Sequence, residues 1–217
     1  MKEFKGAIFD LDGTIIDSMD VWETIDIKFL EKRNITMPND YIEKINSMSF
    51  EEVAKYTIER FNLNESVDSL IKEWNDMAIY EYSNNIKLKP NVKEYLVKLK
   101  KHDIKIGLAT SSPKELYEPV LKNNKVYDYF DTLVFGDEVE NGKPAPDIFL
   151  KACEKFEINP KEAFVIEDSV LGATAANRAG IKCLVVEDTI KFTEEENKLA
   201  YRKFGSLLEI KKLEILI

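Results

Sequence analysis

The sequence predicts an α/β protein: a parallel sheet with helices on both faces, and an all-helical segment inserted after the first strand. Two observations predict this fold class. Short apolar runs rich in strand-forming residues alternate with helical patterns from about residue 90 to residue 186. A first apolar run at 6–9 is separated from that series by residues 15–85, which show helical spacing and no strand pattern. The predicted core is therefore 1–14 with 89–217, and the predicted insertion is 15–88.

Local signals place the elements of the insertion. The run at 6–9 reads as a buried strand that ends in Asp10-Leu11-Asp12-Gly13-Thr14. Four helices should follow: one through 21–30, a short one opened by Pro38, one after a capping box of Ser49 and Glu52, and one from about 66 to 82. The insertion would connect to the core near 15–17 and 88–90, which are the expected hinges if the segment opens and closes.

The core alternates more regularly. Helices are expected at 92–101, after Ser112-Pro113 with the proline at the first helical position, at 146–156, and at 169–179 before Gly180. Strands are expected at 104–109, 132–135, 163–166 and 182–186. From Thr193 onward we expect a helix and a short closing element. Such alternation with short connections is typical of a parallel sheet.

Composition excludes several classes of function. The 217 residues include 31 basic and 40 acidic side chains, a formal charge of −9, so a basic footprint for nucleic acid is absent. No apolar run reaches the roughly 18 residues of a membrane span, and the stretch at 6–9 is too short for a signal peptide. Cys153 and Cys183 lie in apolar patterns and are expected to be buried thiols. We expect a cytoplasmic protein with neither nucleic acid nor membrane as partner. A monomer is expected, and an oligomer is left open.

The single histidine excludes several mechanisms. His102 lies in the polar cluster Lys100-Lys101-His102-Asp103, where a helix is expected to end. A Ser-His-Asp triad, a Cys-His dyad or a multi-histidine zinc site is therefore not expected. The chemistry must use carboxylates, hydroxyls, lysines or a metal.

Polar residues follow four of the predicted strands, where ligands of open α/β sheets bind. They are Asp10 and Asp12, then Thr110, Ser111 and Ser112, then Lys143, and finally Glu167 and Asp168. Oxygen ligands favour a hard cation such as Mg²⁺, and the lysine and hydroxyls suit a phosphate. One aspartate could attack phosphorus while the other protonates the leaving oxygen. A calcium loop starting at Asp10 is rejected, because Val21 stands where that loop needs a glutamate.

These motifs resemble those of the haloacid dehalogenase (HAD) superfamily of phosphohydrolases, in the branch with β-phosphoglucomutase and phosphoglycolate phosphatase. The matching stretches are 9–14, 109–112, 142–147, 167–172 and 175–180. The resemblance implies a Rossmann-like core with an inserted helical cap at 15–88. It also implies a Mg²⁺-dependent phosphatase that hydrolyses a small phosphorylated metabolite through an aspartyl phosphate.

Roles carried over by position are also implied by the resemblance. Asp10 would be the nucleophile, and Asp12 the general acid that later activates water. Thr110, Ser111 and Lys143 would bind the phosphoryl group. Mg²⁺ would be held by the side chains of Asp10 and Asp168 and by the main-chain carbonyl of Asp12. Glu167 would lie among these ligands or beside them.

Two alternatives remain at this point. β-Phosphoglucomutase carries a histidine where Trp22 stands, and a cap lysine and arginine that align with Asn46 and Phe50. The polar groups that would orient a sugar phosphate for return transfer are absent, which favours hydrolysis over a β-phosphoglucomutase-like sugar phosphomutase. A signalling receiver domain also pairs acidic residues, Mg²⁺, a hydroxyl and a lysine, but receivers are much shorter and lack a helical insertion.

Overall fold

The structure is a computed structural model, and it describes residues 4–46, 48–186 and 191–205 of the chain. The described chain forms two compact units. One contains the residues up to Met19 and those from Ile86 onward, and the other is Asp20–Asn85. The first unit includes 15–19 and 86–88, which lie within the predicted insertion 15–88. Ile15 and Ile16 are fully buried there, and Ile16 forms a β-bridge with Leu88, which explains the shorter second unit.

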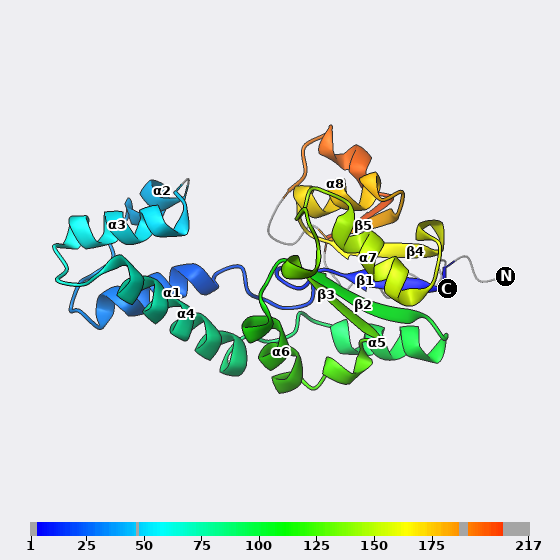
Figure 1. Cartoon of the computed structure of the whole chain (residues 1–217), viewed down its shortest axis with the longest axis horizontal. Helices are drawn as coiled ribbons and strands as arrows, with labels where there is room; N and C mark the ends of the chain where they lie inside the picture. Colours follow the sequence, from blue (N-terminus) through cyan, green and yellow to red (C-terminus); the bar gives the residue numbers. More distant parts are fainter. Residues whose placement is uncertain (1–3, 47, 187–190, 206–217) are drawn as a thin grey trace. The chain divides into compact units, whose positions relative to one another are not determined.

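The first unit is built on a six-stranded sheet in the order β3-β2-β1-β4-β5-β6, with every neighbouring pair parallel. The strands are β1 (Gly6–Phe9), β2 (Lys105–Thr110), β3 (Thr132–Phe135), β4 (Ala163–Glu167), β5 (Lys182–Val186) and β6 (Arg202–Phe204). Figure 1 shows α5 (Val92–Lys101) and α6 (Lys114–Asn123) on one face, with α7 (Asp147–Phe156) and α8 (Val170–Arg178) on the other. The predicted α/β sheet with helices on both faces is confirmed.

Short 3₁₀ turns complete this unit. They are η1 (Tyr127–Tyr129), η2 (Gly136–Glu138), η3 (Pro160–Glu162) and η4 (Glu196–Leu199). In the stretch after Thr193, where a helix and a short closing element were expected, the described residues form the single turn η4 and then β6. The rest of that stretch, beyond residue 205, lies outside the described residues.

Burial on both faces explains why the central strands β1 and β4 consist mostly of apolar residues. All four residues of β1 and all five of β4 are buried. The side chains of α7 and α8 pack on the sheet and form a core with it, which includes Ile8, Val134, Phe149, Phe156, Val165, Ala176 and Val185. Cys153 and Cys183 are buried free thiols, as predicted. The core therefore fixes the strands whose carboxyl ends carry the polar motifs.

The second unit consists of four helices, as the sequence predicted. They are α1 (Val21–Glu31), α2 (Tyr41–Ile45), α3 (Phe50–Phe61) and α4 (Val67–Asn84). The capping box is present: Ser49 Oγ accepts from the Glu52 amide, and the Glu52 carboxylate accepts from the Ser49 amide. Trp74 of α4 anchors the interior with an edge-on contact to Phe29, their ring centroids 5.4 Å apart.

One predicted helix start is wrong. Helix α6 begins at Lys114 with Pro113 as its N-cap, and the Ser112 side chain does not cap it. The Ser112 hydroxyl instead donates to Asp12. Pro113 has an extended backbone, with φ of −68° and ψ of 162°, so it precedes the helix as its N-cap and is not its first helical residue.

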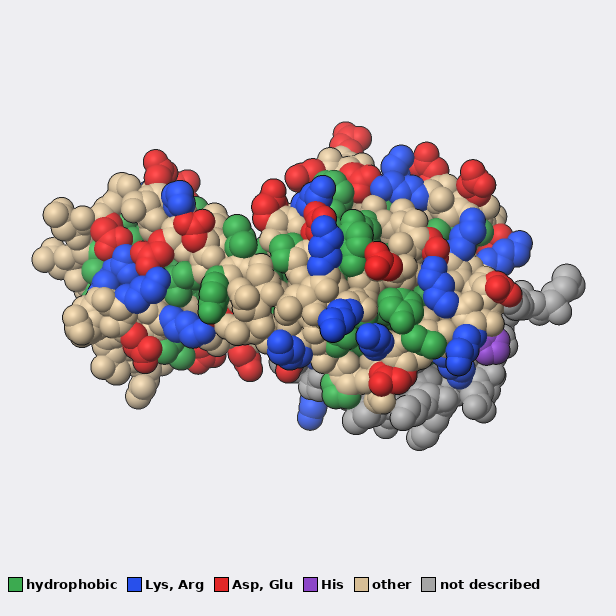
Figure 2. Space-filling model, turned by 90° about the horizontal axis from the view of Figure 1, so that it is seen from below, with side chains coloured by type: hydrophobic (Ala, Val, Ile, Leu, Met, Phe, Trp, Pro, Cys, Tyr) green, Lys and Arg blue, Asp and Glu red, His purple; other side chains and the backbone are tan. Residues whose placement is uncertain are grey.

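The surface carries both signs of charge. Figure 2 shows Lys and Arg side chains interspersed with acidic and hydrophobic ones over the face in view. Among the described helices, none combines the length and the apolar composition that a bilayer crossing requires.

Candidate active site

Three buried carboxylates meet at the carboxyl edge of the sheet. Asp10 directly follows β1, while Glu167 ends β4 and Asp168 follows it. Because β1 and β4 are adjacent and parallel, their last residues share one edge. One oxygen from each of the three side chains lies within 4.8 Å of the others. The structure thus brings together three of the four residues predicted as metal ligands.

The positively charged ammonium of Lys143 contacts two carboxylates of this acidic cluster. The Lys143 ammonium donates to Asp10 Oδ1 at 2.5 Å and to Glu167 Oε1 at 2.7 Å. Its side chain is only 8% exposed. Burial would lower the pKa of Lys143, but the charges of Asp10 and Glu167 outweigh burial and raise it. Lys143 is therefore a charged lysine placed beside the predicted nucleophile.

Glu167 is held by a set of donors at the start of α8. Its Oε2 accepts from the amides of Asp168 and Ser169, at 2.9 and 2.8 Å, and from the Ser169 hydroxyl at 2.9 Å. Ser169 also caps α8 by accepting from the Gly172 amide. A Cβ at Gly172 would lie 1.7 Å from Glu167 Oε1, so the absent side chain leaves the space that Glu167 fills.

Asp168 is oriented by the turn after β1. The Thr14 hydroxyl donates to Asp168 Oδ1 at 3.0 Å. Gly13 has a φ of +74°, and a Cβ on it would lie 2.0 Å from Asp168 Oδ2. Burial, reinforced by the charge of Glu167, raises the pKa of Asp168 to about 6. The turn therefore holds a carboxylate that is costly to ionise without a further cation.

The acidic cluster fits a hard divalent cation. Burial raises the pKa of Asp10 well above its usual value, with Lys143 opposing and Glu167 adding to the shift. Burial is the first cause of the raised pKa at both Asp10 and Asp168, so a cation beside them would offset the cost of ionising these carboxylates. Carboxylate oxygens are the ligands that Mg²⁺ takes, so the donor set matches the group that the sequence implied.

The Asp12 carboxylate is close enough for its charge to raise the pKa of Asp10, but it is held by other partners. Its Oδ1 accepts from the Ser18 hydroxyl at 2.7 Å, and its Oδ2 accepts from the Ser112 hydroxyl at 2.6 Å. Among the described residues, the group of carboxylates close enough to share an ion contains Asp10, Glu167 and Asp168. The side chain of Asp12 thus serves a different purpose from that of Asp10.

The predicted phosphate-binding hydroxyls follow β2, the other neighbour of β1. Thr110 ends β2 and is 1% exposed, and its Oγ1 accepts from the Ser112 amide at 3.0 Å. Ser111 is exposed. Since β1 and β2 are adjacent and parallel, these hydroxyls lie at the same edge of the sheet as Asp10.

Sequence reasoning assigned no role to several residues of this site. Ser18 and Thr14 each hold one of the aspartates, and Gly172 makes room for Glu167. Lys89 is a buried lysine whose charge lowers the pKa of Asp168. Thr14 stood in the motif at 9–14 and could have been found there, but a lone hydroxyl at Ser18 gives no pattern.

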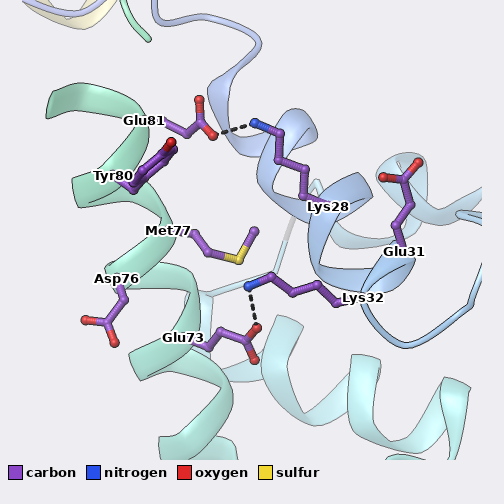
Figure 3. Close-up of a pocket in the computed structure, with 8 residues that line it drawn as sticks. All are labelled: Lys28, Glu31, Lys32, Glu73, Asp76, Met77, Tyr80 and Glu81. Carbon is purple, nitrogen blue, oxygen red and sulfur yellow. Dashed lines mark hydrogen bonds and ion pairs between the residues drawn. The ribbon is translucent and has the colours of Figure 1, made fainter. Parts of the chain in front are cut away.

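A separate groove of about 800 Å³ lies within the second unit, between α1 and α4. Figure 3 shows its lining: Lys28, Glu31, Lys32, Glu73, Asp76, Met77, Tyr80 and Glu81. Lys28 donates to Glu81 and Lys32 to Glu73, so these charges neutralise one another and join the two helices. The groove shares no residue with the acidic cluster, and we assign the chemistry to the cluster.

Comparison with known proteins identifies the class. Residues 7–186 match the family model described as haloacid dehalogenase-like hydrolase. The chain is 31% identical over 178 residues to a phosphorylated carbohydrates phosphatase from Thermotoga maritima, covering 82% of each chain. It is 30% identical over 223 residues to a proposed pseudouridine-5'-phosphatase from Drosophila melanogaster, covering 97% of this chain and 93% of the relative.

A solved structure agrees. The crystal structure of a proposed β-phosphoglucomutase from Thermotoga maritima superposes with a TM-score of 0.90 at 28% identity, covering 99% of this chain and all of the other. The chain belongs to the haloacid dehalogenase-like hydrolases. The predicted family, the Rossmann-like fold and the hydrolase class are confirmed, and phosphatase is the activity that the relatives' names give.

Proposed function

We propose that this protein is a Mg²⁺-dependent phosphatase that hydrolyses a small phosphorylated metabolite through an aspartyl phosphate on Asp10. One observation carries the proposal: a buried carboxylate at the end of β1 lies against a charged lysine and two further carboxylates. The names of the relatives support a phosphorylated carbohydrate or a related small metabolite as substrate. The cytoplasmic location remains a prediction.

The first step is phosphoryl transfer to the enzyme. An oxygen of the Asp10 carboxylate attacks phosphorus while the bond from phosphorus to the leaving oxygen breaks. The leaving oxygen takes a proton from the carboxylic acid of Asp12, so an alcohol departs and Asp12 becomes a carboxylate. Lys143, Thr110 and the amides that follow β2 stabilise the charge on the equatorial phosphoryl oxygens.

The second step returns the enzyme to its starting state. Asp12 removes a proton from water as that water attacks phosphorus, and the bond from phosphorus to Asp10 breaks. Phosphate leaves, Asp10 is again a carboxylate, and Asp12 again carries a proton. No histidine is required, which agrees with the composition of the chain.

Asp10 and Asp168 would hold Mg²⁺, together with the main-chain carbonyl of Asp12, and Glu167 would lie beside them. When bound, the ion would neutralise the phosphoryl charge and keep the carboxylates ionised. Glu167 accepts from three donors through Oε2 and from Lys143 through Oε1, which favours an orienting role for it over direct ligation. We also propose that the helical unit, inserted after β1, acts as the cap.

The second candidate is a phosphomutase with the same first step, which the likeness to the β-phosphoglucomutase structure favours. In that reaction the aspartyl phosphate is returned to the sugar. Incubation with β-glucose 1-phosphate distinguishes the two: phosphate should accumulate for a phosphatase, and glucose 6-phosphate for a mutase.

The test measures release of phosphate from a panel of phosphorylated sugars, nucleotides and short acids, with Mg²⁺ and with a chelator. Asp10→Asn should abolish turnover, because an amide is a poor nucleophile. Asp128→Asn is the matched control, since Asp128 is exposed on η1 away from the acidic cluster. Full activity in Asp10→Asn would refute the assigned nucleophile.

A further inference from the structure

Two serine hydroxyls hold both oxygens of the Asp12 carboxylate. Ser18 donates to Oδ1 at 2.7 Å and Ser112 donates to Oδ2 at 2.6 Å. The two serines come from different segments, since Ser18 precedes the helical unit and Ser112 follows β2. A carboxylate whose two oxygens accept from two different segments of the chain has a fixed orientation.

Ser112 is itself fixed to the sheet. Its amide donates to the Thr110 hydroxyl at 3.0 Å, which ties it to the last residue of β2. Pro113 follows it directly as the N-cap of α6, and a following proline restricts the backbone of the residue before it. Ser112 therefore connects the predicted phosphate-binding Thr110 to the predicted proton donor Asp12.

A hydroxyl suits this position because it is neutral and can donate to both forms of Asp12. In the cycle proposed above, Asp12 alternates between a carboxylic acid and a carboxylate. A serine hydroxyl donates to the carboxylate and can still donate to the carbonyl oxygen of the acid, which leaves the acid proton for the leaving oxygen. A lysine ammonium in its place would favour the carboxylate through its charge. Neither Ser18 nor Ser112 has to move a heavy atom between the two steps.

We propose that Ser112 is a positioning residue that orients the carboxyl group of Asp12 toward the leaving oxygen, with Ser18 holding the other oxygen. This inference rests on the proposed phosphatase function. Ser112 acts through Asp12 and forms no bond to phosphorus. Its loss should leave the nucleophile in place and impair proton donation.

This role predicts a dependence on the leaving group. Nitrophenolate departs with little protonation, whereas phenolate and alkoxides need a proton in the transition state. Misplacing the acid should slow the second kind of substrate more, because general acid catalysis contributes about 10²–10⁴-fold where the proton is needed. A change in phosphate binding would instead slow all substrates alike.

The experiment compares Ser112→Ala with the unmodified protein on a series of aryl phosphates from nitrophenyl to phenyl phosphate, in saturating Mg²⁺. The quantity measured is kcat/KM, which reports the step that breaks the ester bond. We expect an extra loss of about tenfold or more for phenyl phosphate relative to nitrophenyl phosphate. Ser112→Thr, which keeps the hydroxyl, should restore most of the lost activity. Ser69→Ala, on an exposed face of α4, is the matched control.

The outcomes are distinguishable. A uniform loss across the series, or no loss, would overturn the positioning role while leaving the proposed function intact. If Asp10→Asn hydrolyses the whole series like the unmodified protein, the proposed function itself fails. Should Ser112→Ala not fold, Ser112→Cys fills the same position with a weaker donor, and the same unequal loss is expected.

Discussion

At the scale of single residues, the acidic cluster depends on space as much as on charge. Glu167 and Asp168 occupy positions that a methyl group on Gly172 or Gly13 would invade. Glu167 is further held by the amides at the start of α8, which donate to one of its oxygens. The absence of two side chains is thus part of the geometry of the site.

Gly172→Ala tests this directly. In an ordinary helix interior the change stabilises by about 0.5–1 kcal/mol. Here the new Cβ would lie 1.7 Å from Glu167 Oε1, so the carboxylate must move away. We expect a net destabilisation of about 1–3 kcal/mol in urea unfolding and a loss of phosphatase activity. Gly142→Ala is the control, because a Cβ there meets nothing within 4 Å. A stabilised, fully active Gly172→Ala variant would contradict the packing described for Glu167.

The charged residues of the site were predictable from the sequence, and among the residues that orient them Ser18 was not. Asp10, Glu167, Asp168 and Lys143 follow strands and stand out by their chemistry. Ser18 could not be predicted because a single hydroxyl in an irregular turn follows no helical or strand spacing and matches no capping motif. Its role depends on Asp12, which it reaches only in the folded chain.

At the scale of elements, charged side chains join the helices of the second unit. Arg33, just after α1, donates through Nε and Nη2 to Glu65, and through Nη2 to Glu73 of α4. Its guanidinium lies 3.7 Å from the centre of the Phe29 ring. A planar group with several donors fills this position better than an ammonium can.

Arg33→Lys should therefore destabilise the protein although it keeps the charge. We expect a loss of about 1–2 kcal/mol in urea unfolding, because the lysine cannot make the paired bonds to Glu65 or stack on the ring. Lys55→Gln breaks an exposed pair with Glu51 and should change the stability by about 0.5 kcal/mol or less. Equal effects of the two substitutions would argue against the special geometry at Arg33.

Asp26 of α1 gives the second unit a dependence on pH. Burial, and then the charge of Glu23, raises the pKa of Asp26 to about 7 from an ordinary value of 3.8. The folded state therefore binds this proton more tightly, so its contribution to stability is full below about pH 4 and is lost as the pH rises to 7.

Asp26→Asn should flatten that part of the stability profile and make the protein more stable above pH 7. The gain in the free energy of unfolding is at most about 4 kcal/mol, because each unit of pKa difference corresponds to roughly 1.4 kcal/mol. Chemical unfolding at several pH values measures it. Glu23→Gln, which removes the exposed neighbouring charge, should reduce the slope by a smaller amount. An unchanged slope in Asp26→Asn would show that other groups cause it.

The sequence predicted the elements better than their exact ends. The capping box of Ser49 and Glu52 located α3 because both partners are local. The start of α6 was misplaced by one residue because the φ of a proline suits both a first helical residue and an extended one, and Pro113 is extended with a ψ of 162°.

At the scale of the whole molecule, a chain with a formal charge of −9 must bind an anionic substrate. Attraction has to come from local positive groups: Lys143, the amides at helix starts and, in the proposed function, a bound Mg²⁺. The parallel sheet could be predicted from alternation, but its order could not, because alternation does not say which strand lies next to β1. That order places β2 and β4 beside β1 and so assembles the site.

Mg²⁺ should stabilise the protein without any substrate, because it relieves repulsion among the buried carboxylates. At a concentration a hundred times its dissociation constant, a ligand adds about 2.7 kcal/mol. We expect a higher thermal midpoint with Mg²⁺ than with a sodium salt of equal ionic strength, and reversal by a chelator. The increase should be largely lost in Asp168→Asn. An undiminished increase in that variant would place the ion elsewhere.

The most direct test of the account is to locate the phosphoryl group. The protein is mixed with a substrate found in the panel, quenched in acid within milliseconds, and its peptides are analysed by mass spectrometry. The proposed mechanism predicts a phosphoryl group on Asp10 in the unmodified protein and none in Asp10→Asn. A phosphoryl group on any other residue, or turnover by Asp10→Asn at the full rate, would contradict it.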